Sequence, residues 1–294
     1  MPSVEVFSPA KLNLFLAVTG RRSDGFHDLV SVVTPVRFGD KLKVELVPGG
    51  GLSLACEDPA LPRDETNLIL RAARLFVEAL GRPVDARFIL EKRIPMGAGL
   101  GGGSSNAVAT LLALNRLTGH PLSRAALSSL SVKLGSDCAL FLHDAPVVMR
   151  GRGERIEPLA TGASSRLSGR RVLIFKPSFG IATAWAYARM AAGAPESYLS
   201  APEAEAKVAV WLASAEPAEK LIFNNMERPA FAKYVALPTL LERLRSEFGL
   251  AVAMSGSGSA CFALLRDDVS VAKVRACIQE GWGQHAFVMD TEIV

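Results

Sequence analysis

The sequence predicts an α+β protein of two domains, and three observations support this. Strand-like apolar patterns alternate with amphipathic helical patterns along the whole chain. The 294 residues are enough for one large domain or two ordinary ones. A stretch of small and polar residues, 161–169, is the best candidate boundary. We therefore expect an N-terminal domain over residues 1–160 and a C-terminal domain over residues 161–294.

The first strands carry a lysine in an unusual place. Residues 4–7 alternate and predict a short strand, and the mainly apolar residues 8–18 follow with Lys11 among them. Such a lysine indicates either an exposed edge or a cation held in a site, and the pattern leaves both open. Two further strands are expected at 29–38 and 41–47, with a turn between them at Gly39-Asp40.

The next elements lead to the most glycine-rich segment of the chain. Residues 48–64 are expected to be mainly loop. A helix is expected over 68–80, with Thr66-Asn67 as its cap and Gly81 after its end. A strand over 84–91 precedes the glycine-rich segment.

Residues 95–106 are the segment on which the functional interpretation depends. They contain five glycines and two serines and run into an apolar helical pattern over 106–117. Glycine lets the backbone approach a ligand closely, Ser104 or Ser105 can cap the helix, and a helix N-terminus attracts anions. No acidic residue occurs from Lys92 to Ser136. The segment therefore predicts a phosphate-binding loop rather than a merely flexible surface loop.

Other phosphate motifs fit this loop less well. A Walker A loop would need a lysine after its last glycine, and Ser104 follows Gly103. A dinucleotide-binding G-x-G-x-x-G pattern does match at Gly97, Gly99 and Gly102. That pattern also needs an acid about 20 residues later to bind the ribose, and none occurs before Asp137. A dinucleotide-binding oxidoreductase therefore stays a weaker alternative.

Three side chains outside the loop are candidate functional residues. Phe26 and His27 are adjacent in a turn-rich segment, and such a pair is either solvated or able to clamp a flat base. Asp137 follows a helix expected over 123–134 and is either a helix cap or a catalytic carboxylate.

The C-terminal half predicts alternating strands and helices. A second glycine-serine segment, 255–259, lies between two apolar strands and is either a hairpin turn or part of a site. Strands are expected at 172–176, 251–254, 260–263 and 285–290, and helices at 181–190, 239–248 and 269–280, with a further alanine-rich, mainly helical segment at 192–218.

The composition limits the class of protein. The net charge of +4, from 33 basic and 29 acidic residues, gives no basic tail of the kind that binds nucleic acid. The four cysteines form no C-x-x-C pair, so neither a zinc ribbon nor a disulfide framework is indicated. No secretory signal or membrane span is expected, and a cytoplasmic location is predicted.

Three segments together resemble the motifs of the GHMP superfamily of small-molecule kinases. Pro9 to Leu14 is similar to the first motif, Met96 to Ala107 to the second, and Ala251 to Ala263 to the third. The resemblance implies an N-terminal α/β domain with a left-handed-type βαβ nucleotide site and a C-terminal ferredoxin-like α+β domain. It also implies an enzyme that transfers phosphate from ATP to an alcohol, with Mg²⁺ as the metal.

The same resemblance implies roles for individual residues. Asp137, in Leu134-Gly135-Ser136-Asp137, would be the catalytic base, and Lys11 would orient it and the alcohol. Cys138-Ala139 stands where relatives often have Val-Pro. The residues implied to contact substrate are Asn13, Phe26, His27 and Thr183. The residues implied to bind ATP are Pro95, Met96, Gly97, Ala98, Gly99, Leu100, Gly101, Gly102, Gly103, Ser104 and Ser105.

The implied substrate is a small molecule that carries a cytidine diphosphate group, because Phe26-His27 resembles the element with which one kinase family within this superfamily holds cytosine. No protein metal ligand, nucleic-acid partner or membrane partner is expected, and the protein is expected to be a monomer or weak homodimer. Another GHMP-type kinase with a different alcohol substrate stays the closest alternative.

Overall fold

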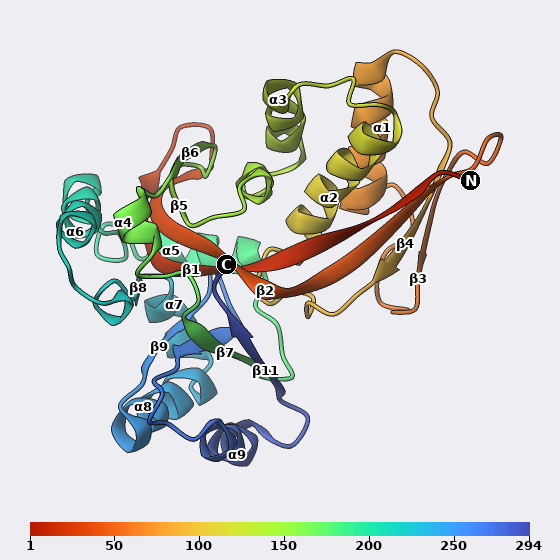
Figure 1. Cartoon of the computed structure of the whole chain (residues 1–294). Coiled ribbons are helices and arrows are strands. Elements are labelled where there is room, and N and C mark those ends of the chain that lie inside the picture. Colours follow the sequence, from red (N-terminus) through yellow and green to blue (C-terminus); the bar gives the residue numbers. More distant parts are fainter. The chain divides into compact units, whose positions relative to one another are not determined.

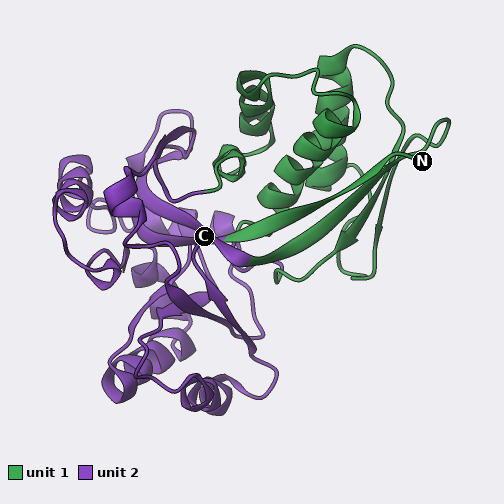
Figure 2. Ribbon diagram, viewed as in Figure 1, with its two compact units in different colours: residues 1–10, 38–95, 101–144 green, residues 11–37, 96–100, 145–294 purple.

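The computed structural model describes all 294 residues, and its elements are labelled in Figure 1. The chain forms two compact units (Figure 2). Unit 1 comprises Met1–Ala10, Phe38–Pro95 and Gly101–Asp144, and unit 2 comprises Lys11–Arg37, Met96–Leu100 and Ala145–Val294. Strands β1 (Ser3–Arg21) and β2 (His27–Leu46) contribute to both units. None of the helices has the length and apolar character needed to cross a bilayer.

Unit 1 is a sheet with helices on one side (Figure 2, green). Its part of β2 pairs antiparallel with β4 (Ala86–Glu91), and β3 (Leu52–Cys56) pairs parallel with β4. The three helices are α1 (Leu68–Leu80), α2 (Gly102–Leu117) and α3 (Arg124–Leu134). The core between helices and sheet includes the fully buried side chains of Leu42, Phe76, Phe88 and Leu111.

Unit 2 contains a second sheet of four antiparallel strands in the order β11-β7-β10-β9 (Figure 1). Helices α8 and α9 pack together, and α8 contacts β9. The strands are β7 (Arg171–Lys176), β9 (Ala251–Met254), β10 (Cys261–Leu264) and β11 (Phe287–Glu292), and the helices are α8 (Ala236–Phe248) and α9 (Val271–Trp282).

The remaining elements of unit 2 surround its parts of β1 and β2. β1 pairs parallel with β8 (Phe223–Asn224), and β2 pairs antiparallel with β5 (Val147–Gly151), which pairs with β6 (Arg155–Pro158). The helices here are α4 (Thr161–Ser164), α5 (Thr183–Ala192), α6 (Ala201–Ala213) and α7 (Glu227–Lys233). Two 3₁₀ turns, η1 in unit 1 and η2 in unit 2, span Ala139–Leu142 and Ala218–Lys220.

Several predicted elements are confirmed at their ends. The side chain of Asn67 accepts a hydrogen bond from the N–H of Ile69 and caps α1, and Gly81 follows α1 in the left-handed conformation. Ser123 caps α3 in the same manner as Asn67 caps α1. The strands on either side of residues 255–259 pair antiparallel, as the hairpin alternative for that segment predicts.

The predicted turn at Gly39-Asp40 is wrong, because β2 runs through it without interruption. A Cβ on Gly39 would lie only 2.8 Å from the Cα of Pro9, so glycine is required here by a close approach of two strands. Asp40 is fully buried rather than exposed in a turn. The loop expected over 48–64 also contains a strand, β3, whose short pattern is not distinctive.

The predicted start of α2 is also wrong. The helix begins at Gly102, not near Asn106, and its N-cap is Gly101 with φ 72° and no side-chain cap bond. Ser104 and Ser105 therefore lie inside the first turn and do not cap the helix. The glycine-rich sequence hid this turn, because glycine has a low intrinsic helix propensity.

Candidate active site

The glycine-rich loop has a backbone that only glycine adopts easily. Gly97, Gly99 and Gly101 have φ values of 61°, 75° and 72°. Between them Ala98 and Leu100 are buried and anchor the loop in the protein. Because Gly101 offers no capping side chain, the first N–H groups of α2 are left for a ligand or water. This arrangement fits the phosphates of a nucleotide.

The centre of the loop, residues 96–100, packs against the second glycine-serine segment within unit 2. The N–H of Ala260 donates to the carbonyl of Ala98 at 3.0 Å, and the Ser255 hydroxyl donates to the carbonyl of Gly99 at 3.2 Å. A Cβ on Gly99 would collide with the Ser255 carbonyl. The segment 255–259 therefore connects two antiparallel strands and also packs against the glycine-rich loop.

Lys11 and Asn13 lie beside this pair of loops. Lys11 is only 4% exposed, so the interpretation as an exposed edge residue is wrong. Its ammonium group donates to the amide oxygen of Asn13, and its backbone N–H donates to the carbonyl of Leu100 at 3.0 Å. A Cβ on Gly256 would lie 3.2 Å from the Lys11 Nζ, which explains a glycine at this point. The first, second and third motif segments thus meet in unit 2.

Ser31 and Thr183 extend the group of polar side chains in unit 2. The Asn13 amide donates to the hydroxyl of Ser31 at 2.9 Å, and Ser31 donates to the carbonyl of Phe15 at 2.6 Å. This fixes the rotamer of Asn13 with its oxygen toward Lys11. Thr183, the first residue of α5, exchanges a hydrogen bond of 3.0 Å with the hydroxyl of Ser257. Ser31 gave no signal in the sequence, because a single serine in an apolar strand is common.

Asp137 lies in unit 1, in the short connection between α3 and η1. The N-cap position of η1 is Cys138, so Asp137 does not occupy the cap position that its sequence suggested. Cys138 is buried, and burial raises the pKa of its thiol to about 11. This thiol stays protonated at neutral pH, consistent with a packing role.

His27 lies among aromatic side chains of unit 2, and the adjacent Phe26 lies beside Arg152. His27 Nε2 is 3.2 Å from the hydroxyl of Tyr198, and its ring centroid is 4.9 Å from that of Tyr187. Phe26 is 51% exposed, with the Arg152 guanidinium 4.7 Å from its ring centroid. No sequence pattern connects Tyr187 and Tyr198 with His27. The one sequence signal for them is that two of the three tyrosines in the chain lie within 12 residues of each other.

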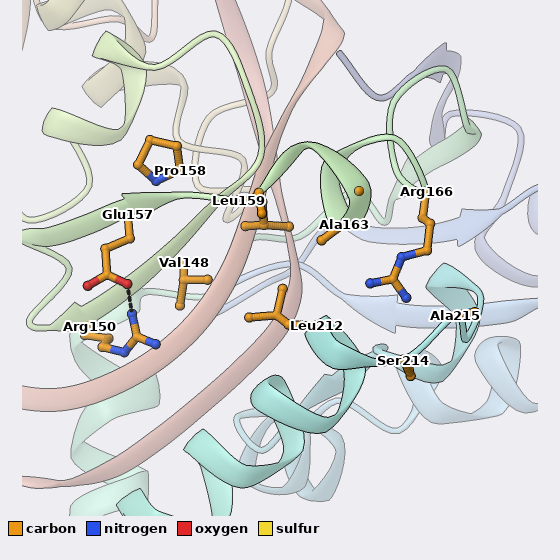
Figure 3. Close-up of a pocket in the computed structure, with 12 residues that line it drawn as sticks. Val148, Arg150, Glu157, Pro158, Leu159, Ala163, Arg166, Leu212, Ser214 and Ala215 are labelled. Carbon is orange, nitrogen blue, oxygen red and sulfur yellow. Dashed lines mark hydrogen bonds and ion pairs between the residues drawn. The ribbon is translucent and has the colours of Figure 1, made fainter.

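A separate cavity of about 470 Å³ opens in unit 2 between β5, β6, α4 and the end of α6 (Figure 3). Val148, Leu159 and Leu212 line it, together with two arginines. Both arginines already have partners: Arg150 pairs with Glu157 and Glu205, and Arg166 stacks on Trp211 with 3.9 Å between guanidinium carbon and ring centroid. The cavity contains none of the predicted site residues, and its charges are largely compensated.

Comparison with known proteins identifies the family. The model described as "GHMP kinases N terminal domain" matches residues 67–151, and that described as "GHMP kinases C terminal" matches residues 209–284. The 4-diphosphocytidyl-2-C-methyl-D-erythritol kinase of Methylacidiphilum infernorum is 36% identical, with 89% of this chain and 86% of the relative covered. The enzyme of the same name from Prochlorococcus marinus is 38% identical, with 94% and 88% covered.

Solved structures agree with the sequence relatives. A crystal structure of 4-(cytidine 5'-diphospho)-2C-methyl-D-erythritol kinase has a TM-score of 0.75 at 36% identity and covers 98% of this chain and 99% of its own. The mevalonate kinase of Methanococcus jannaschii has a TM-score of 0.74 at 13% identity, which shows a shared fold.

These matches confirm the predicted α+β fold class and the kinase class. They favour the kinase interpretation over a dinucleotide-binding oxidoreductase. The chain is an ATP-dependent phosphotransferase with an alcohol group as acceptor. It belongs to the 4-diphosphocytidyl-2-C-methyl-D-erythritol kinase family of the GHMP kinases.

Proposed function

We propose that this protein transfers the γ-phosphoryl group of ATP to the tertiary 2-hydroxyl of 4-diphosphocytidyl-2-C-methyl-D-erythritol, giving the 2-phosphate and ADP in the non-mevalonate route to isoprenoids. The observation that carries the proposal is the meeting of three motif segments: the Lys11-Asn13 pair, the loop centre 96–100 and the segment 255–259. Relatives of this name match the chain over about nine-tenths of its length.

The glycine-rich loop is proposed to hold the phosphates of ATP through its main-chain N–H groups. The positive φ values of Gly97, Gly99 and Gly101 support this, because L side chains there would be strained. No group of three or more His, Cys, Asp or Glu side chains that could hold a metal ion is present. Mg²⁺, when bound with ATP, would neutralise charge on the phosphates.

Lys11 and Asp137 are proposed to act on the acceptor alcohol. Asp137 accepts the hydroxyl proton as the oxygen attacks the γ-phosphorus, and the bond to the ADP oxygen breaks. Lys11, held by Asn13, orients the hydroxyl and offsets the negative charge that develops there. Thr183 and Ser257 are proposed to contact the remainder of the acceptor.

Phe26 and His27 are proposed to bind the cytosine ring, with Tyr187 and Tyr198 as supporting residues. The exposed ring of Phe26 offers a surface for stacking, and the imidazole offers a polar edge. The Tyr198 hydroxyl and the Tyr187 ring fix the orientation of that imidazole.

The pH dependence of substrate binding tests the role of His27. Burial, assisted by the positive charge of Arg21, lowers the pKa of His27 below its ordinary range. The imidazole is therefore neutral at neutral pH, and any interaction that requires the neutral form is present above the lowered pKa and lost as the pH falls through it. We expect the KM for the cytidyl substrate to be constant from pH 8 to about 6.5 and to rise only below that.

Steady-state kinetics across this pH range are the measurement, with His27→Gln as the control. The glutamine variant should have a raised KM without the rise at acidic pH. A wild-type KM that already increases between pH 8 and pH 7 would argue against a His27 with a lowered pKa.

Competition by cytidine nucleotides tests the substrate class directly. CDP and CMP are expected to compete with the alcohol substrate, whereas UMP, which presents a different base edge, should compete at least about tenfold less well. Equal inhibition by all three nucleotides, or by none, would favour a GHMP-type kinase with another alcohol substrate.

Three broader expectations stay proposals. The division into domains at residues 1–160 and 161–294 is supported by the two family models, whose matches lie on either side of it. The free cysteines fit a cytoplasmic location. A monomer or weak homodimer is proposed as the functional state.

A further inference from the structure

Asp40 is a buried carboxylate in unit 1 that no step of the proposed reaction uses. It belongs to β2, is fully buried, and accepts four hydrogen bonds. Its Oδ1 accepts from the backbone N–H groups of Arg93 at 2.7 Å and Ile94 at 2.8 Å. Its Oδ2 accepts from the Asn106 amide at 2.9 Å and from the Lys92 ammonium group. All four of these hydrogen bonds come from two short segments of the chain, residues 92–94 and Asn106.

Those two segments are the two ends of the glycine-rich loop. Residues 92–94 lead into the loop, and Asn106 lies in the first turns of α2, just after it. The Asn106 amide also donates to the Ser8 hydroxyl at 2.8 Å, and Ser8 donates to the hydroxyl of Ser105 at 2.7 Å. One carboxylate is therefore the common acceptor for the entry and the exit of the loop.

Asp40 places a negative charge close to a loop that is proposed to bind phosphate. A carboxylate close to a phosphate-binding loop would repel a polyanion if its charge were exposed. Here the charge is buried and compensated by Lys92, whose side chain is 7% exposed. A buried ion pair seldom increases net stability over an apolar pair, so stability alone is a weak reason for it. Its geometry instead fixes the separation between the two ends of the loop.

We infer that Asp40 is a positioning residue for ATP: by holding both ends of the glycine-rich loop, it keeps the main-chain N–H groups of the loop aimed at the phosphates. The inference rests on the proposed function, because it assumes that the loop binds ATP. A loop whose ends move apart by about 1 Å loses much of its effect on bound phosphate.

Asp40→Asn is the direct test, since it preserves size but replaces one acceptor oxygen by an NH₂ donor. That donor would face Lys92 and Asn106, both donors themselves, and the exit of the loop would lose its anchor. We expect the KM for ATP and the dissociation constant of a non-hydrolysable ATP analogue to rise about 10- to 100-fold. The KM for the alcohol substrate should stay within about twofold of the wild-type value.

Asn115→Ala is the matched control for a general loss of stability. Asn115 is also buried and lies on α2, but at its other end, where its side chain bonds the N–H and carbonyl of Leu122. This variant should lower the melting temperature without a selective change in the KM for ATP. If Asn115→Ala and Asp40→Asn raise the KM for ATP equally, Asp40 has only a structural role and the inference is overturned.

Asn106→Ala keeps the inference testable if Asp40→Asn does not fold. It leaves Asp40 bonded to Lys92, Arg93 and Ile94 and removes its link to α2, together with the bond from Asn106 to Ser8. We expect a smaller rise in the KM for ATP, about three- to tenfold, with the alcohol KM unchanged. An unchanged KM for ATP in this variant, in an active wild-type background, overturns the inference alone. A wild-type protein that neither binds the ATP analogue nor phosphorylates the alcohol overturns the proposed function and the inference with it.

Discussion

Replacing Asp137 by asparagine is expected to lower kcat by about 10²- to 10⁴-fold, the range that a positioned general base contributes. The dissociation constants of ATP and of the alcohol substrate should change little. Asparagine has nearly the same shape as aspartate, so packing around the connection between α3 and η1 is preserved. The amide cannot accept a proton from the attacking hydroxyl, so the loss is confined to the chemical step.

Asp144→Asn is the control for this experiment. The same substitution of aspartate by asparagine is made at Asp144, which lies seven positions later in unit 1 and has an exposed side chain. Its kcat should equal that of the wild type. Single-turnover kinetics with both variants separate chemistry from product release. A kcat near the wild-type value for Asp137→Asn would remove this residue from the role of base.

Gly101→Val is expected to abolish measurable ATP binding, with an affinity loss of about 100-fold or more. Gly101 has φ 72° and is the N-cap of α2. A β-branched residue is strained in this conformation, and its side chain would stand beside the first N–H groups of the helix. The loop can relieve the strain only by changing the direction of those N–H groups, which removes the proposed phosphate site.

Gly119→Val separates this effect from backbone strain. Gly119 lies just beyond the other end of α2, has φ 86°, and has no atoms within 4 Å of the position that a Cβ would take. The two valine variants should therefore lose similar stability, measured as melting temperature. Only Gly101→Val should lose the heat of ATP binding in calorimetry. Wild-type affinity for ATP in Gly101→Val would show that this loop does not hold the phosphates.

Local sequence patterns were sufficient to predict features that depend on hydrogen bonds between residues close together in the chain. Asn67 was predicted as a cap and caps α1, because a capping side chain bonds an N–H two or three residues away. The helix expected over 123–134 is α3, which Ser123 caps in the same way. The glycine-rich loop and the segment 255–259 were likewise evident from composition. The start of α2 was missed because glycine lacks the helical preference that marks a helix.

Interactions between distant segments were beyond local patterns. Asp40, next to Gly39, has the composition of a turn, yet its partners stand more than 50 positions away. The sequence from Lys92 to Ser136 has no acid, and the fold nevertheless brings the carboxylate of Asp40 to both ends of the loop. The tyrosines that contact His27 come from residues 187 and 198, and no spacing connects them with His27.

The amino-acid sequence by itself determined the family, the class of reaction and the position of the glycine-rich loop, because these depend on residue types at short, fixed spacings. Only the tertiary structure decided that Lys11 is buried against Asn13, that β2 is one uninterrupted strand, and that Asp40 holds the loop. The physical reason is that burial and hydrogen-bond partners at long sequence separation are set by the packing of whole elements, which no short window of sequence contains.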